Sequence, residues 1–153
     1  MVAEAFVVLM VAALPVSELR GAIPLALGVY QFDPLSAYLL GVLGNLLPVP
    51  ILLKLLGPVT ALLRRSVLLN RGVSWLLART RKRHSALIER LGAMALVLFV
   101  AVPLPATGAW TGALIAHVFE IPFRYAFPLI ALGVSIAGVL VTLATLGVIK
   151  FFF

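Results

Sequence analysis

The stretch PVSELRGAIP, Pro15 to Pro24, interrupts a run of residues that is otherwise apolar from Ala5 to Tyr30. The chain of 153 residues is 63% hydrophobic and 11% charged, with a mean hydropathy of +1.20. This composition is more apolar than one soluble core needs and predicts an all-α integral membrane protein. Because a charged side chain inside a bilayer costs about 2.5–3.5 kcal/mol, Glu18 and Arg20 within this stretch need compensation or have a use.

A second interruption of the same kind is PLPATGAWTG, at residues 103–112. We call residues 15–24 the first break and residues 103–112 the second break. The apolar runs before them, Ala5–Leu14 and Leu91–Val102, reach only about half of a bilayer as helices. After each break, a short apolar segment leads to a polar turn and then to a run long enough to span, Leu35–Gly57 or Phe127–Ile149.

The order of these elements repeats, so the chain is expected to form a single membrane domain, 1–153, with related halves at 1–57 and 91–153. If the breaks are tips of re-entrant hairpins, each half crosses the membrane once and the two repeats are inverted. If they are kinks in spanning helices, each half crosses twice and the repeats are parallel. We favour re-entrant hairpins, because two prolines would otherwise interrupt a spanning helix at mid-depth.

Positive charge is concentrated between the halves. The net charge is +7, and the basic residues between positions 64 and 90 are Arg64, Arg65, Arg71, Arg79, Arg81, Lys82, Arg83 and Arg90. The positive-inside rule predicts that segment 64–90 is cytoplasmic in a cell membrane. Residues 58–90 suit a basic amphipathic connector lying at the lipid surface, and a solvated basic loop fits them equally well. We expect membrane lipids as partners and no nucleic acid.

We predict a substrate site where the two breaks meet, because Gly/Pro-interrupted segments at corresponding positions of two halves point to a midplane binding site. Its candidate residues are Glu18, Arg20, Gly21, Pro105, Thr107, Gly108, Trp110 and Thr111. Gly21 would let the backbone turn, and Thr107 would cap the helix after the second break. Two helix starts beside Arg20 suit a phosphate or carboxylate.

Glu18 and His117 are the candidates for proton coupling. In the alternative interpretation, Glu18 and Arg20 only bond backbone groups that the prolines leave free. Trp110 could stack on a substrate or pack at a helix crossing, and for Asn45 we favour a hydrogen bond between helices. Cysteine is absent, as are the GxxxxGK[ST], HExxH and GxSxG motifs, so we expect no enzyme, metal or cofactor.

The motifs ELRGAIPL, Glu18–Leu25, and PLPATGAWTGALIA, Pro103–Ala116, resemble those of the small multidrug export protein family of bacterial and archaeal membranes. The likeness in length, order and basic centre covers nearly the whole chain. That family is more remotely similar to the DedA superfamily, which implies paired re-entrant hairpins and flipping of lipid-carrier phosphates. The DedA pattern places arginines in the second half, whereas here the arginine at a break is Arg20.

The resemblance and the residues together lead us to expect a secondary transporter or exporter of small amphipathic or anionic molecules, with proton coupling. One alternative is a lipid-carrier phosphate flippase or scramblase of the DedA type. Another is a membrane scaffold that transports nothing. A homodimer fits each of these, because a chain with two confident spans is small for enclosing a pathway.

Overall fold

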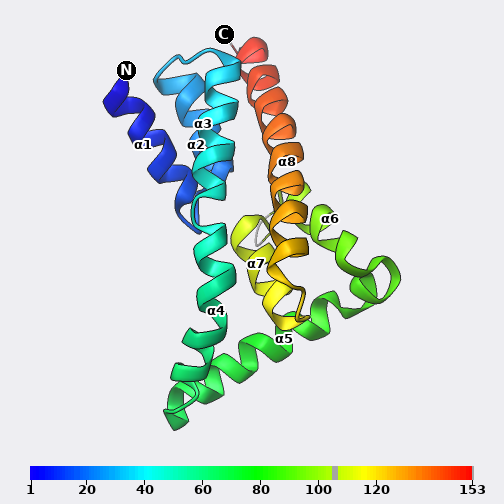
Figure 1. The fold of residues 1–153 in the computed structure, drawn as a ribbon. Helices are drawn as coiled ribbons and strands as arrows, with labels where there is room; N and C mark the ends of the chain where they lie inside the picture. Colours follow the sequence, from blue (N-terminus) through cyan, green and yellow to red (C-terminus); the bar gives the residue numbers. More distant parts are fainter. Residues whose placement is uncertain (105–106, 153) are drawn as a thin grey trace.

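Every regular element is a helix within residues 1–104 and 107–152, the part of the chain that the computed structural model describes (Figure 1). The elements, in chain order, are α1 (Val2–Ala13), α2 (Glu18–Pro24), the π-helical turn η1 (Leu25–Val29), α3 (Pro34–Leu46), α4 (Val49–Leu63), α5 (Val67–Leu91), the 3₁₀ turn η2 (Gly92–Met94), α6 (Ala95–Ala101), α7 (Ala109–Val118) and α8 (Phe123–Phe152). The all-α prediction is confirmed.

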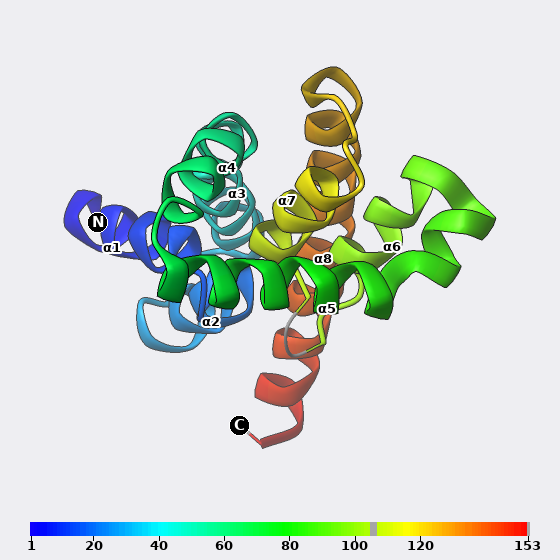
Figure 2. The same ribbon diagram turned by 90° about the horizontal axis from the view of Figure 1, so that it is seen from below.

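Three helical stretches are long and apolar enough to cross a membrane: Pro34–Leu63, Val67–Ala101 and Phe123–Phe152. The chain is therefore a membrane protein. The first and third stretches contain the two spans expected from sequence. The second is a correction to that expectation, although it is not straight: Gly92, with φ of 59°, ends α5, and α6 leaves in another direction (Figures 1 and 2).

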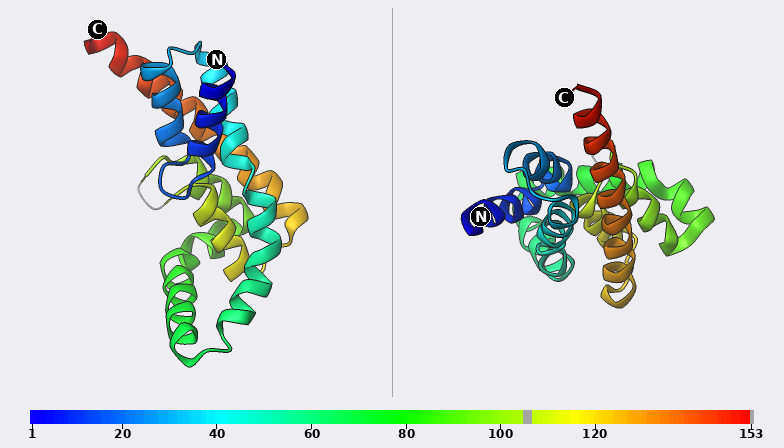
Figure 3. Two further views of the ribbon diagram at one scale, coloured as in Figure 1. Left: turned by 90° about the vertical axis from the view of Figure 1, so that its left-hand side faces the viewer. Right: turned by 90° about the horizontal axis from the view of Figure 1, so that it is seen from above.

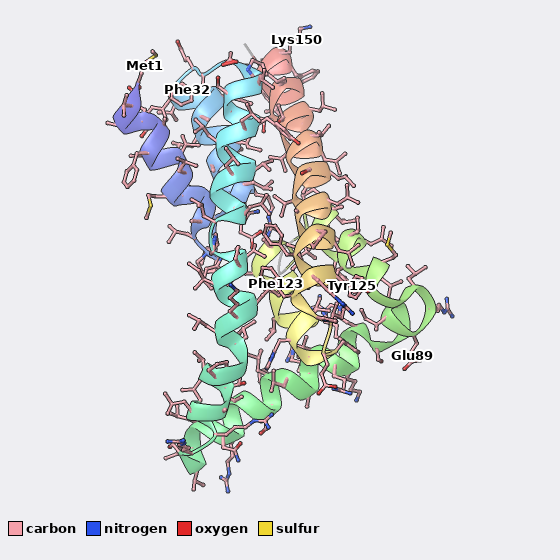
Figure 4. All side chains as sticks on the ribbon, in the orientation of Figure 1. Met1, Phe32, Glu89, Phe123, Tyr125 and Lys150 are labelled. Carbon is pink, nitrogen blue, oxygen red and sulfur yellow. The ribbon has the colours of Figure 1, made fainter. Side chains whose placement is uncertain are left out.

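The first half starts and turns at the same end of the molecule. α1 runs from this end to the middle, and α2 with η1 returns to it (Figures 1 and 3). Figure 4 labels Met1 and Phe32 there, together with Lys150 near the end of α8. The reversal after α1 depends on Glu18, which takes a positive φ of 47°. Each of the two arms is thus about half as long as the molecule.

α3 and α4 then run the whole length of the molecule (Figure 1). Asp33 caps the start of α3, where its side chain accepts a hydrogen bond from the Ser36 N–H at 3.2 Å, and Pro34 occupies the first turn. Pro48 and Pro50 separate α3 from α4, because neither ring nitrogen can donate a helical hydrogen bond.

α5 crosses beneath the other helices at the opposite end (Figure 2). A helix in the connector is confirmed. It begins at Val67 rather than at residue 58, because residues 58–63 still belong to α4. From the far end of α5, α6 returns to the middle, and α7 runs from the middle back toward α5 (Figure 1). α8 starts after the turn at residues 119–122, beside α7, and runs back to the end of the molecule at which α1 begins (Figure 1).

Two glycines let the short helices α1 and α6 approach the long helical stretches that contain α3 and α8. A Cβ atom added at Gly44 would lie 2.6 Å from the Leu9 carbonyl oxygen of α1. One added at Gly133 would lie 2.7 Å from the Val100 Cβ of α6. Helix backbones in membranes pack closely where such small residues lie at the crossing. These crossings hold both breaks against the centre of the molecule.

Candidate functional site

The two breaks contact each other in the middle of the molecule, as the blue and yellow-green segments in Figure 3 show. The contact joins residues from opposite halves of the sequence. Among the described residues, the side chains of Glu18 and Arg20 bind backbone groups of the second break, and the side chain of Trp110 binds Ala13, just before the first break. The structure thus brings together most of the residues that the sequence singled out.

The Glu18 side chain is buried, at 2% exposure, against the start of α7. Its Oε1 accepts a hydrogen bond from the Trp110 backbone N–H at 3.4 Å. Gly108 precedes α7 with φ of 119°, and its missing side chain leaves the space that the Glu18 carboxylate occupies. A carboxylate is stabilised at this position by the free N–H groups and the positive end of the helix dipole.

Arg20 is bound mainly to backbone of the second break. Its Nη2 donates to the Thr107 carbonyl oxygen at 2.6 Å, and its Nη1 donates to the carbonyl oxygen of Leu104. Nη2 also lies 3.5 Å from Glu18 Oε2, a long contact for an ion pair. Glu18 and Arg20 therefore lie near each other, and each also binds backbone groups of the second break.

These bonds occupy the groups that the sequence assigned to an external anion. The start of α7 holds Glu18, and the guanidinium of Arg20 is taken by carbonyl groups. Sequence reasoning missed the Leu104 carbonyl, because nothing in a sequence marks a backbone acceptor. In this conformation, the second break binds the charges of the first, as the alternative interpretation proposed.

A cavity of about 10 Å³ remains between the breaks, which is roughly the space of one water. Its lining includes Glu18, Arg20, Thr107, Gly108 and Asn45. Asn45 is buried, at 1% exposure, and neither its Nδ2 nor its Oδ1 has a hydrogen-bond partner among the described residues. The expected hydrogen bond between helices is therefore wrong. Such an amide is costly unless a ligand or water binds it.

Two detailed predictions at the breaks need correction. Gly21 lies within α2, and the backbone turns at Glu18 instead. Thr107 does not cap α7, because Gly108 takes that position. The Thr107 hydroxyl instead binds Val102, just before the second break, and Leu104 within it. For Trp110, the structure agrees with the packing alternative, because its Nε1 donates to the carbonyl oxygen of Ala13 at the end of α1 at 3.1 Å.

The remaining candidates lie elsewhere or outside the described part. Pro105 is outside the described residues. Thr111 is in the first turn of α7, one residue beyond Trp110. His117 lies at the other end of α7, where its Nε2 is 3.3 Å from Thr60 Oγ1 of α4. The structure therefore does not bring His117 to Glu18.

The model of one protein family, described as "Putative small multi-drug export protein", matches residues 18–140, which include both breaks. The chain belongs to this family. The family name points to export of small molecules and specifies no substrate or mechanism. No curated protein and no solved structure matches the chain. The remote similarity to the DedA superfamily stays a prediction.

Proposed function

We propose that this family member is a secondary exporter of small amphipathic molecules in which the two breaks form a gate. The observation that carries the proposal is the contact between Glu18, Arg20 and the second break, beside the unpartnered Asn45. Buried charges in a membrane protein are costly, and they commonly mark a transport pathway or proton relay. In this view, the conformation described here is the closed one.

The gate requires the breaks to enter the membrane from opposite faces, as tips of re-entrant hairpins in inverted repeats. Two features support this arrangement. The turn before α3 lies at the end of the molecule where Figure 4 labels Phe32, whereas the turn at residues 119–122 lies beyond the breaks, beside α5 (Figure 1); Gln31 and Glu120 in these turns both take a positive φ. The crossings at Gly44 and Gly133 correspond as well, since both pairs are 89 residues apart in the sequence (31 to 120, and 44 to 133).

The positive-inside rule then orients the molecule. We propose that the end with the arginines of α5 is cytoplasmic, so the turn at Glu120 is cytoplasmic and the turn at Gln31 faces the other side. The breaks then meet at mid-depth, between half-length arms from either face. Irregular backbone is tolerated at that depth only where protein or water surrounds it. Glu18 and Gly108 are buried, so in this proposal the exposed residues of the breaks, Val16 and Leu104 among them, face water or a second copy of the chain.

Glu18 is the proposed proton-coupling group. A protonated carboxyl group is a weaker acceptor for the Trp110 N–H and no longer attracts Arg20. Protonation therefore weakens the bonds that close the gate, and the small cavity can widen. Substrate would then meet apolar side chains, the Asn45 amide and the two charged groups. Loss of the proton closes the breaks again.

The test is transport by the purified chain in proteoliposomes under an imposed pH gradient, with ethidium as a cationic amphipath and carboxyfluorescein as an anionic probe. We expect the gradient to drive one of the two probes in the wild-type protein. Glu18→Gln should reduce this flux by about tenfold or more, because a charge-assisted bond is worth about 1.5–3 kcal/mol. Glu89→Gln is the matched control, because Glu89 lies on the outer edge of the α5–α6 bend (Figure 4).

Two results would overturn the proposal. Flux that responds equally to Glu18→Gln and Glu89→Gln would remove Glu18 from coupling. Vesicles that move neither probe would contradict export of this class of substrate; the same vesicles would then be tested with a fluorescent phospholipid and a dithionite quench. Lipid movement would favour the flippase alternative, and its absence would favour the scaffold.

A further inference from the structure

A second, much larger cavity lies between α4, α5 and α7, away from the breaks. Its volume is about 720 Å³, within the range of pockets that hold drug-sized ligands. The residues that line it are Thr60, Ala61, Arg64, Ser74, Leu77, Ala78, Arg81, His117, Val118 and Glu120. The transport proposal does not use this cavity.

The cavity is rich in hydrogen-bond donors. Arg64 has no partner for its guanidinium among the described residues. Arg81 uses one nitrogen, Nη2, to donate to the Val118 carbonyl oxygen at 2.8 Å, and its other N–H groups are left for a ligand. Two arginines face one acid, Glu120, so the charged side chains that line the cavity have a net positive charge.

The contact between His117 and Thr60 determines which nitrogen of the His117 imidazole carries a hydrogen. The Thr60 hydroxyl donates to the Gly57 carbonyl oxygen at 2.9 Å, which uses its single proton. Thr60 Oγ1 therefore accepts in its contact with His117, and Nε2 is the nitrogen that carries the hydrogen. This bond holds the imidazole in place at the wall of the cavity, between α4 and α7.

We propose that this cavity binds the phosphate group of an anionic organic molecule, either a phospholipid headgroup or a soluble phosphate ester. Arginine side chains from two helices can donate to a phosphate from different directions, and the planar guanidinium matches its oxygens. The volume leaves room for the organic part. The cavity lies beside the basic helix α5, where anionic phosphate compounds are concentrated by charge.

The experiment measures binding by native mass spectrometry of the full chain. In one arm, detergent-solubilised protein is titrated with phosphatidylglycerol, with phosphatidylcholine as the zwitterionic comparison. In the other arm, glycerol 3-phosphate and inorganic phosphate are added as competitors. The variants are Arg64→Gln and Arg81→Gln. Their matched controls are Arg65→Gln and Arg79→Gln, which remove the same charge at residues that do not line the cavity.

We expect Arg64→Gln and Arg81→Gln each to weaken phosphatidylglycerol binding by about tenfold, since a hydrogen bond to a charged group is worth about 1.5–3 kcal/mol, and the controls to change it less than about twofold. Competition by glycerol 3-phosphate would assign the cavity to soluble phosphate esters, and no competition would assign it to the lipid.

Equal losses in all four variants would show diffuse charge attraction and overturn the proposal. Binding of phosphatidylcholine as tight as that of phosphatidylglycerol, or no phosphate-dependent binding at all, would also overturn it. Arg81 also binds Val118, so Arg81→Gln could fail to fold. In that case, the binding of phosphatidylglycerol by Arg64→Gln decides the outcome.

Discussion

Glu18 is the residue on which the contact between the two halves most depends. Its backbone makes the first turn, with φ of 47°, and its carboxylate takes the place of a side chain at Gly108. A residue other than glycine at φ of 119° is strained in any case. The carboxylate of Glu18 in the first break therefore fits only against a glycine at position 108 of the second break.

Gly108→Ala should lower stability and open the contact. The strain of its backbone costs about 1–3 kcal/mol, and the new methyl group would displace the Glu18 carboxylate. Thermal unfolding in detergent measures the loss. Gly147→Ala is the control, because a Cβ at Gly147 meets nothing within 4 Å. Equal melting temperatures for the two variants would contradict the close approach of Glu18 to Gly108.

Asn45→Leu separates a structural role from a ligand-binding role. The Asn45 amide makes no hydrogen bond to the described residues, so its removal should leave stability unchanged or raise it, by up to about 1–3 kcal/mol. Transport should fall in the proteoliposome assay. Asn45 would instead have a structural role if the variant unfolded more easily in detergent while its transport stayed at the wild-type level.

At the scale of elements, the start of α3 depends on a charged cap. Hydrogen bonds from Ser36 lower the pKa of the exposed Asp33 below its ordinary value of 3.8. A lowered pKa means that the charged form adds stability above the ordinary value and that this addition is lost as the pH falls through the lowered value. Asp33→Asn removes the charge and keeps a capping side chain.

We therefore expect wild type to melt above Asp33→Asn at neutral pH, by a small margin because the group is exposed, with the difference vanishing as the pH falls below 3.8. Melting in detergent across a pH series measures it. A difference that persists unchanged at acid pH would show that the carboxylate charge does not stabilise this helix start.

The sequence predicts these elements well where proline or glycine decides them. It places both breaks and both long apolar stretches, at 34–63 and 123–152, because apolar length and helix-breaking residues are local properties. It does not predict the reversal at Gly92, since a lone glycine after a long basic helix has several local solutions. It also assigns the cap of α7 to Thr107, although the hydroxyl finds closer acceptors in and just before the second break.

At the scale of the whole molecule, the sequence predicts which residues form the candidate site but not which hydrogen bonds they make. The charges and glycines at the breaks select Glu18, Arg20 and Gly108. Their partners depend on packing between segments more than 80 residues apart in the sequence, as in the bond from Arg20 to Thr107. The large basic cavity is not predictable at all, because its lining comes from three helices whose mutual placement no local pattern encodes.

We propose that the two halves of the molecule enter the membrane from opposite faces and meet at Glu18. Single cysteines at Gln31 and Glu120 test this most directly, because both turn residues are exposed and both have a positive φ, so the two substitutions carry similar strain. The chain has no cysteine of its own, so no background must be removed. A membrane-impermeant maleimide should label Gln31→Cys only in right-side-out vesicles and Glu120→Cys only in inside-out vesicles. Labelling of both cysteines from the same face would contradict the account.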